Sequence, residues 1–458
     1  MVKVREDYAV TGDGQVDIER WVRQIESQTH LEDAEQFRRA CEMAAAIDVQ
    51  AVREDRVWAP GASSFRTGIE MAQVLVELHL DQTSLVAAIL YRAVREERIP
   101  LEDIRKEFGD EVAGLIDGVQ QMAAISSIHH PLKGNVLGQT EGQLDNVRKM
   151  LVTMIDDVRV ALIKLAERTC AIRAVKNASE EKRMRVAREV FDIYAPLAHR
   201  LGIGHIKWEL EDLSFRYLHE TAYKKIAKLL DEKRLDRESY IKRVITTIKD
   251  ELVASGIDGE LSGRAKHIYS IWRKMRRKGI DFSQVYDVRA VRILVPEVRD
   301  CYAALGIVHT LWRHIPNEFD DYVANPKENG YQSLHTAVIG PEGKVMEVQI
   351  RTQAMHEEAE LGVCAHWLYK GMDKGNRSVG YDAKINWLRQ VLEWQEELGD
   401  LSGLADHLKS DVASDRVYVF TPEGHVVDLP QGATPVDFAY RVHTEIGHAC
   451  RGAKVNSR

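Results

Sequence analysis

Apolar positions repeat at helical spacing over the first half of the chain. Between residues 145 and 175 they follow the period of a helix, at Val147, Met150, Leu151, Met154, Val158, Leu162, Leu165 and Ile172. This spacing places them on one helix face, and we expect helices from the start of the chain to about residue 215. A polar stretch with glycines at 133–142 interrupts the pattern and predicts a loop.

The pattern changes at about residue 240. Helical stretches then alternate with period-2 segments, VRAVRILV at 288–295 and KVMEVQIRT at 344–352, which predicts strands among helices. Two tryptophan-containing helical stretches follow at 365–369 and 384–398. Segments 416–420 and 425–429, joined by Pro422-Glu423-Gly424, predict a hairpin in a small β-rich domain. This succession predicts a multidomain protein of α and α+β class.

Length and composition narrow the class of protein. A chain of 458 residues with 45% apolar and 29% charged residues is typical of a globular protein with two to four domains. A net charge of -8 argues against a general nucleic-acid coat or a basic membrane binder, so any phosphate site must be local. We expect a cytoplasmic protein, because no signal peptide or membrane-length apolar run occurs. Five scattered cysteines without CxxC spacing predict reduced thiols. The last residues, KVNSR, follow a strand-like beginning, so we expect a C-terminally truncated segment.

The segment RAKHIYSIWRKMRRK, at 264–278, carries seven Lys or Arg residues and no acid. Read as one helix, it has an apolar stripe made of Ile268, Ile271, Trp272 and Met275. The opposite side carries Lys266, Ser270, Arg273, Lys274 and Arg277. Such a face suits a polyanion such as a triphosphate, and the alternative is a solvated basic face.

Two acidic residues accompany the predicted strands. Asp287 opens the strand at 288–295. In the other strand Met346, Val348 and Ile350 alternate with Glu347, Gln349 and Arg351, so one face goes to the core and the other presents a carboxylate, an amide and a guanidinium. A carboxylate on each strand is suited to Mg²⁺ held mainly by substrate phosphates. For either acid alone, an ordinary exposed carboxylate remains the alternative.

Between these strands lies EFDDYVANPKENGYQSLHT, at 318–336. Pro326, Asn329 and Gly330 predict a turn-rich loop. If the residues after it are extended, Tyr331, Ser333 and His335 lie on one side. An aromatic ring beside phosphate-binding residues suits stacking on a nucleobase, although a single Tyr can equally be a packing residue.

With these motifs the chain resembles the RelA/SpoT family of (p)ppGpp synthetases, and most closely its RelA-type branch. The resemblance runs from about residue 20 to 458 and rests on GRAKHIYSIWRKM, YDVRAVRI, DDYVANPKENGYQSLHT, MEVQIRT and AELGVCAHWLYK. It implies transfer of pyrophosphate from ATP to the 3′-hydroxyl of GDP or GTP in the stringent response, in a mixed α/β nucleotidyltransferase-like domain. A catalytically silent nucleotide-sensing or ribosome-binding module of the same fold is the alternative.

The resemblance also assigns roles to residues. It implies ATP contacts from Arg264, Lys266, Ser270, Lys274 and Arg277. It implies that Asp287 and Glu347 are catalytic and hold Mg²⁺, with Glu347 also taking the proton of the acceptor hydroxyl. Tyr331 resembles the residue that stacks on guanine, and its companions are Lys327, Asn329, His335, Gln349 and Arg351. Ala265 departs from the family, which usually has proline there.

The helical half resembles the family's Mn²⁺-dependent hydrolase domain, an all-helical HD-type fold, without its ligands. The metal positions fall on Thr67, Tyr91, Arg92, Arg95, Glu96, Glu167 and Ala171. Tyr and Arg cannot replace His and carboxylate ligands of a hard cation, so we expect a pseudo-hydrolase. The acidic motif Glu318, Asp320 and Asp321 resembles that of synthesis-only members and can recruit a cation, or it is simply an acidic surface turn.

We expect four segments: a pseudo-hydrolase domain at 1–200, a synthetase domain at 201–380, a helical linker at 381–414 and part of a TGS domain, a β-grasp module, at 415–458. In this family the TGS domain implies the ribosome and uncharged tRNA as partners. His443 matches the residue expected near the terminal adenosine, where a neutral imidazole can stack on a base. The alternative is that His443 packs with Tyr440.

Overall fold

The computed structural model describes residues 10–11, 15–53, 63–127, 157–232, 234–264, 266–282, 285, 288–327, 329–364, 416–420, 426–430, 433–442 and 444–452. The chain forms two compact units, residues 1–392 and 393–458. The expected loop at 133–142, the helical stretches at 365–369 and 384–398, and the linker at 381–414 lie outside the described residues.

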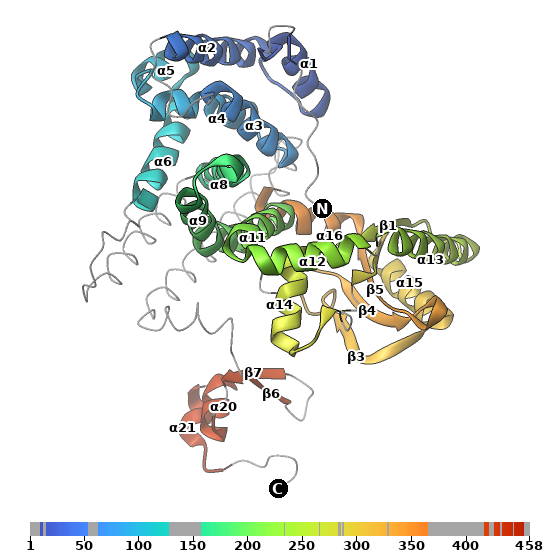
Figure 1. Ribbon diagram of the computed structural model, residues 1–458. Helices are drawn as coiled ribbons and strands as arrows, with labels where there is room; N and C mark the ends of the chain where they lie inside the picture. Colours follow the sequence, from blue (N-terminus) through green and yellow to red (C-terminus); the bar gives the residue numbers. More distant parts are fainter. Residues whose placement is uncertain are drawn as a thin grey trace, which may run out of the picture. The chain divides into compact units, whose positions relative to one another are not determined.

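The first unit begins with helices (Figure 1): α1 (Ile18–Gln28), α2 (Ala34–Arg53), α3 (Ser64–Glu77), α4 (Gln82–Arg95), α5 (Leu101–Phe108), α6 (Asp110–Ser127) and α8 (Val158–Ala174). Side-chain caps begin several of them: Asp17, Ser63, Asp81 and Asp157 each accept a hydrogen bond from a backbone N–H of the first turn. The predicted helical first half is therefore confirmed.

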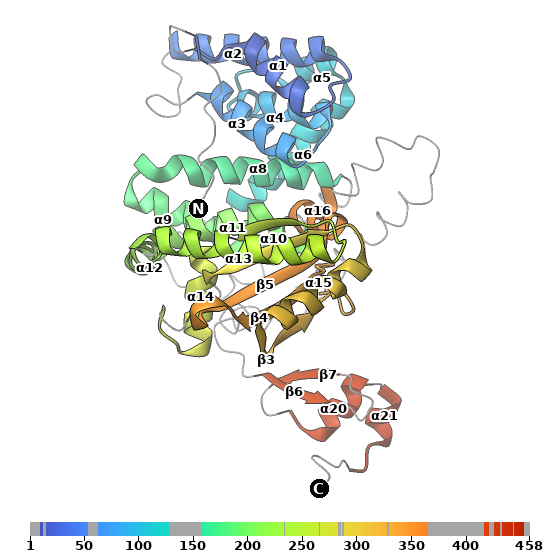
Figure 2. The ribbon, with the colours of Figure 1, turned by 90° about the vertical axis from the view of Figure 1, so that its right-hand side faces the viewer.

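Helix α8 is buried on nearly all sides. It packs against α3 and α6 on one side and against α11 (Gly204–Leu218) on the other (Figure 2). Its side chains Val158, Leu162, Leu165 and Ile172 are buried as predicted, whereas 145–156 lies outside the described residues. A helix that is covered all round needs apolar residues beyond one stripe.

The elements that follow α8 are again helical: α9 (Glu180–Glu189), a π-helical turn (Val190–Tyr194), α10 (Ala195–Arg200), α11, α12 (Glu220–Glu232) and α13 (Arg234–Ala254). The expected change of pattern at about residue 240 is therefore placed too early. Tyr240, Val244, Ile248 and Leu252, four residues apart, keep α13 helical because they bury one face against the sheet that follows.

The sheet has five strands in the order β1-β2-β5-β4-β3. The bounds are β1 (Glu260–Arg264), β2 (Ala290–Val295), β3 (Arg313–Asp321), β4 (Leu334–Ile339) and β5 (Val345–Thr352), with α14 (Ile268–Lys278), α15 (Val298–Leu311) and α16 (Gln353–Leu361) between or after them. Only the β2–β5 pair is parallel, with Ala290 opposite Glu347. The mixed α/β class is thus confirmed.

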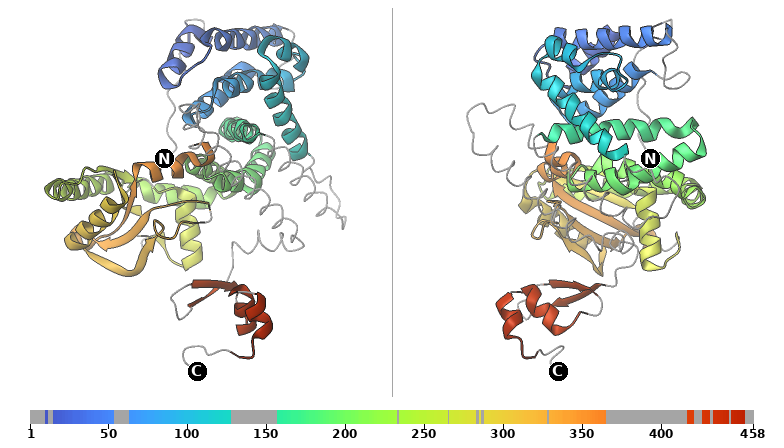
Figure 3. Two further views of the ribbon diagram at one scale, coloured as in Figure 1. Left: turned by 180° about the vertical axis from the view of Figure 1, so that it is seen from behind. Right: turned by 90° about the vertical axis from the view of Figure 1, so that its left-hand side faces the viewer.

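The two faces of β5 differ as the alternation predicts. Met346, Val348 and Ile350 are buried against α13 and α15, which lie side by side on one face of the sheet (Figure 1, Figure 3). Glu347, Gln349 and Arg351 point to the opposite face because successive strand residues alternate. That opposite face carries the chemistry.

The second unit contains β6 (Arg416–Phe420) and β7 (Val426–Pro430), paired antiparallel, and the helices α20 (Pro435–Val442) and α21 (Thr444–Ala449). The predicted hairpin is confirmed.

All five cysteines of the chain are free thiols, in accordance with the sequence. Within the described ranges, no helix is long and apolar enough to cross a membrane.

Candidate active site

A cleft of about 490 Å³ opens on the polar face of the sheet. Its walls come from α10, α11, the end of β1, α14, β3, the loop before β4, β4, β5 and α16. Most of the site residues expected from the sequence line it: Arg264, Lys266, Ser270, Lys274, Arg277, Glu318, Asp320, Lys327, Asn329, Tyr331, His335, Glu347 and Gln349. Residues more than eighty positions apart therefore share one cavity.

The basic segment supplies one wall in two pieces. Arg264 is the last residue of β1, opposite Ala290 of β2, and α14 begins only at Ile268. The prediction of one helix over 264–278 is therefore wrong at its first residues, because β1 pairs with a strand far away in the sequence. The carboxylate of Asp212, on α11, accepts the N–H of Tyr269 at 2.8 Å and so caps α14 from outside.

The apolar stripe of α14 is confirmed. Ile271 is fully buried, and Ile268, Trp272 and Met275 pack beside it against α12. The stripe turns Ser270, Lys274 and Arg277 toward the cleft. Burial of one face thus orients the basic face of the same helix.

Glu347 lies at the centre of the polar face. Its Oε1 accepts a hydrogen bond from Gln349 Nε2 at 2.6 Å and lies 3.8 Å from Arg264 Nη1. His335 Nδ1 is 3.5 Å from the same oxygen. Burial, against the attraction of Glu347, lowers the pKa of His335 to about 4. The imidazole is therefore neutral at physiological pH.

Tyr331, in the loop before β4, lines the cleft. Its hydroxyl lies 2.8 Å from Nε2 of the neutral His335, and Lys327 Nζ lies 5.5 Å from the ring centroid. Burial lowers the pKa of Lys327. Nδ2 of Asn329 lies 3.4 Å from Nδ1 of His199. The loop thus presents an aromatic ring beside a desolvated ammonium group.

Three expected site residues are placed differently from the rest. Arg351 is only 1% exposed and lies behind Tyr331, outside the cleft lining. Asp321 also lies outside the lining: it accepts hydrogen bonds from the Tyr302 hydroxyl at 3.0 Å and from the backbone N–H of Val323 and Ala324, so it shapes the turn after β3. Asp287 lies outside the described residues.

Helices α10 and α11 contribute lining residues that the sequence reading missed: His199, Lys207, Trp208 and Glu211. The guanidinium of Arg264 lies 5.6 Å from the centroid of the Trp208 ring, which also stacks on His267. On α11 the spacing of Lys207 and Glu211 indicates a shared polar face, but only the tertiary fold shows that this face meets the cleft.

The donor set of the cleft fits Mg²⁺ held mainly by substrate phosphates. Among the described residues, no group of three or more His, Cys, Asp or Glu side chains could hold a metal by itself. Mg²⁺ commonly takes one or two protein carboxylates and completes its shell with phosphate oxygens and water. Glu347 presents such a carboxylate inside a basic cleft.

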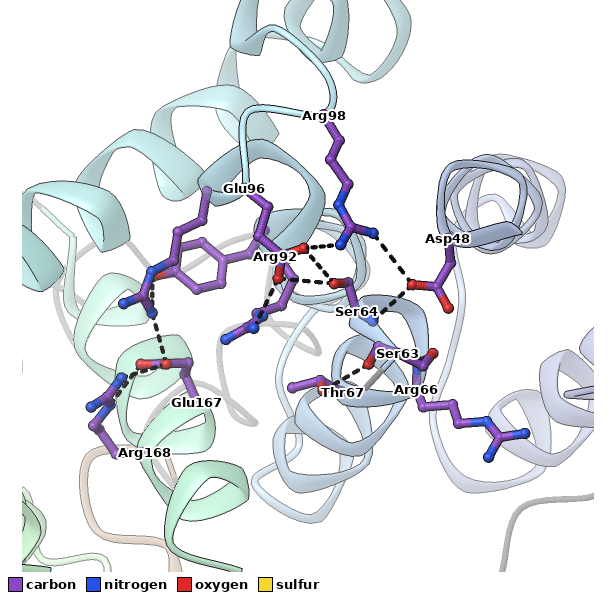
Figure 4. Close-up of polar contacts among 12 residues, drawn as sticks. Asp48, Ser63, Ser64, Arg66, Thr67, Arg92, Glu96, Arg98, Glu167 and Arg168 are labelled. Carbon is purple, nitrogen blue, oxygen red and sulfur yellow. Dashed lines mark hydrogen bonds and ion pairs between the residues drawn. The ribbon is translucent and has the colours of Figure 1, made fainter. Parts of the chain in front are cut away.

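Several of the positions that the sequence led us to expect as hydrolase ligand positions form ion pairs or hydrogen bonds within the helical half. Glu96 pairs with Arg92 at 2.8 Å and with Arg98 at 2.6 Å, and it accepts a hydrogen bond from Ser64 (Figure 4). The Thr67 hydroxyl donates to the Ser63 carbonyl at 3.0 Å. The Glu96 carboxylate is thus already paired with two guanidinium groups.

Glu167 also pairs with cationic side chains, and it is more deeply buried than Glu96. It is 2% exposed and pairs with Arg168 at 2.6 Å, Lys164 at 2.8 Å and Arg95 at 2.9 Å. Burial opposes its ionisation, but these cations keep the pKa of Glu167 well below 4.5. Burial raises the pKa of the neighbouring Tyr91 to about 12. Three cations thus surround the carboxylate.

Comparisons with known proteins agree with this domain structure. Family models match an HD domain at residues 40–204, the region found in RelA / SpoT proteins at 263–374 and a TGS domain at 417–458. The limits proposed for the domains from the sequence stay predictions. A small alarmone synthetase from Bacillus subtilis aligns with 41% of this chain and 98% of its own at 23% identity, and its TM-score of 0.26 is too low to support an argument.

Curated relatives share about half of their aligned residues with the chain. A GTP pyrophosphokinase from Photobacterium angustum is 53% identical over 392 residues, which cover 85% of this chain and 52% of that protein. One from Escherichia coli K12 is 48% identical over 459 residues, covering 100% of this chain and 60% of its own length. The chain therefore spans little more than half the length of these relatives. Since the three domains occur in this order and the identity extends through all of them, the chain belongs to the RelA/SpoT family.

Proposed function

We propose that this chain transfers the β,γ-pyrophosphate of ATP to the 3′-hydroxyl of GDP or GTP and releases AMP. The observation that carries the proposal is the single cleft in which Glu347 faces the basic wall of α14 and the ring of Tyr331. The relatives named GTP pyrophosphokinase support it. The reaction takes place in the cytoplasm if the chain works with the partners proposed below.

The residues of the cleft divide the work. Arg264, Lys274 and Arg277 neutralise the phosphates of ATP, and Mg²⁺, when bound at Glu347 and Asp287, would supply further neutralisation. Tyr331 stacks on the guanine base and so aligns the 3′-hydroxyl with the β-phosphorus. Glu347 takes the hydroxyl proton as the O3′–Pβ bond forms and the bond between Pβ and the α,β-bridging oxygen breaks.

The test is product analysis by ion-exchange chromatography after incubation with ATP, Mg²⁺ and either GDP or GTP. We expect AMP and a guanosine 3′-pyrophosphate in equal amounts. Nucleotide binding without AMP formation would instead support the silent sensing module.

We predict that the chain releases no pyrophosphate from ppGpp when Mn²⁺ is supplied. Tyr91, Arg92 and Ala171 are proposed to stand at ligand positions. The two carboxylates expected there, Glu96 and Glu167, pair with Arg92 and Arg95, so neither is a vacant anionic ligand for a cation. The measurement is phosphate and pyrophosphate release from labelled ppGpp. Mn²⁺-dependent release that a chelator abolishes would show that the hydrolase is intact.

We also propose that uncharged tRNA on the ribosome is a partner, because the chain carries a TGS domain. His443, which lies outside the described residues, is proposed to contact the 3′ end of the tRNA. Replacing His443 by Ala in the full-length protein is expected to reduce the stimulation of synthesis by ribosomes with deacylated tRNA, while basal synthesis stays unchanged. Undiminished stimulation would remove His443 from this role.

A further inference from the structure

Behind Tyr331, two guanidinium groups share one carboxylate. Arg351, on β5, has its Nη2 3.3 Å from Oε1 of Glu360, and Arg292, on the neighbouring β2, has its Nη2 3.7 Å from the same atom. Glu360 comes from α16, which follows β5 directly. No sequence motif had assigned a role to Glu360 or Arg292.

The cluster carries more positive than negative charge. Burial, followed by repulsion between the two guanidinium groups, lowers the pKa of Arg292 to about 10. Burial lowers the pKa of His356 to about 4, so its neutral Nδ1 can accept a hydrogen bond from Arg351 Nη2. Since Arg264 also contributes repulsion to both arginines, Glu360 is the carboxylate that balances them.

The hydrogen bonding of this cluster is incomplete. Nε of Arg292 and Nε of Arg351 are both buried and have no hydrogen-bond partner. Buried donors of this kind cost stability, and a purely structural cluster would do better with apolar side chains. The cost points to a role beyond packing.

The cluster contacts Tyr331, the residue proposed to stack on the guanine base. Cζ of Arg351 lies 5.9 Å from the centroid of the Tyr331 ring, within the range of a cation–π contact. At its other end the Tyr331 hydroxyl is hydrogen-bonded to His335 at 2.8 Å. The ring is therefore fixed at its face by Arg351 and at its hydroxyl by His335.

Helix α16 is itself held in place by α11. The backbone carbonyl of Glu360 lies 3.0 Å from Nδ1 of His205. A Cβ on Gly204 would come within 2.6 Å of the Ala359 carbonyl, so the two helices touch without space for a side chain. The carboxylate of Glu360 thus projects from a fixed backbone.

We infer that Glu360 is a positioning residue for the guanine-nucleotide subsite: it holds Arg351 against Tyr331 and so fixes the ring on which the base stacks. The inference rests on the proposed function, since it assumes that Tyr331 stacks on guanine. Fixing the ring before binding lowers the ordering cost of the complex.

The test measures the affinity of the Glu360→Gln variant for GDP and for a non-hydrolysable ATP analogue by titration calorimetry. We expect GDP to bind about tenfold more weakly, equivalent to about 1.4 kcal/mol, and the ATP analogue to bind as it does to the unmodified protein. Glu357→Gln is the matched control, because Glu357 is exposed on the same helix and accepts a hydrogen bond from Gln353 of that helix. It should change neither affinity.

A double-mutant cycle separates positioning from general structural damage. In a Tyr331→Ala background, Glu360→Gln should cause no further loss of GDP affinity. Equal weakening of both nucleotides, or an undiminished effect without Tyr331, would overturn the inference. If Tyr331→Ala alone leaves GDP affinity unchanged, the stacking in the proposed function is wrong.

A second variant covers the possibility that Glu360→Gln fails to fold. Arg351→Lys keeps the positive charge beside Glu360 but loses the planar group over the ring. We expect the same selective loss of GDP affinity, and equal affinity to the unmodified protein would overturn the inference.

Discussion

Replacing Glu347 by Gln is expected to lower the turnover number for pyrophosphate transfer by about 10²–10⁴-fold, the range that a positioned general base contributes. The amide has nearly the same shape as the carboxylate, so the chain should fold normally. The amide of the Glu347→Gln variant can neither accept the proton of the 3′-hydroxyl nor ligate Mg²⁺ as an anion. The rate is measured as AMP formation at saturating ATP and GDP.

The contacts of the Glu347 side chain indicate what the Glu347→Gln substitution removes. The carboxylate is 15% exposed and is contacted by Arg264, His335 and Gln349. His335 is neutral because burial lowers its pKa to about 4, so it does not offer an alternative charge-assisted partner.

Glu342→Gln is the matched control, because Glu342 lies at an exposed turn directly before β5 and pairs with Arg243 and Lys344. It should leave the rate unchanged. Asp287→Ala is expected to abolish transfer in the same way, on the basis of the family resemblance. A wild-type rate in a correctly folded Glu347→Gln variant would exclude Glu347 from catalysis.

Local periodicity predicted the elements whose structure depends on one buried face. The alternation in β5 placed Glu347 on the polar side of the sheet, and the stripe of α14 turned Ser270 toward the cleft. Both follow from burial of the apolar residues of the same element. The hairpin of β6 and β7 depends equally on nearby residues.

Features that depend on distant partners could not be predicted. Arg264 belongs to β1 because its strand pairs with β2, and the cap of α14 is Asp212, a residue of another helix. The contribution of Trp208 to the cleft likewise requires α11 to approach the sheet. The sequence predicts that Arg351 contacts a nucleotide. In the structure Arg351 is buried and pairs with Glu360 of α16, a contact that depends on the tertiary fold.

The helical half offers the second large effect, on stability. Replacing Glu167 by Gln is expected to lower the free energy of unfolding of this half by about 3–5 kcal/mol, the usual cost of removing one partner of a buried ion pair. The substitution leaves Arg95, Lys164 and Arg168 around a neutral amide. Thermal unfolding followed by far-UV circular dichroism measures the loss.

The pH dependence gives this prediction a second readout. The pKa of Glu167 lies well below 4.5, so its ionisation stabilises the folded state above pH 4.5 and the stabilisation is lost as the pH falls through the lowered pKa. The difference between wild type and variant should therefore shrink in acid. It should also narrow above pH 8, since burial lowers the pKa of Lys164 to about 8 and the neutral amine no longer needs a counter-ion.

Glu35→Gln is the control for Glu167→Gln, because the pair of Glu35 with Arg38 is solvent-exposed and should change the unfolding temperature little. A variant that combines Glu167→Leu with Lys164→Met should recover part of the loss, since it removes a buried charge together with its partner. Equal unfolding temperatures for wild type and Glu167→Gln would mean that the cations are solvated rather than held by Glu167. The ion pairs around Glu167 would then not account for the stability of the helical half.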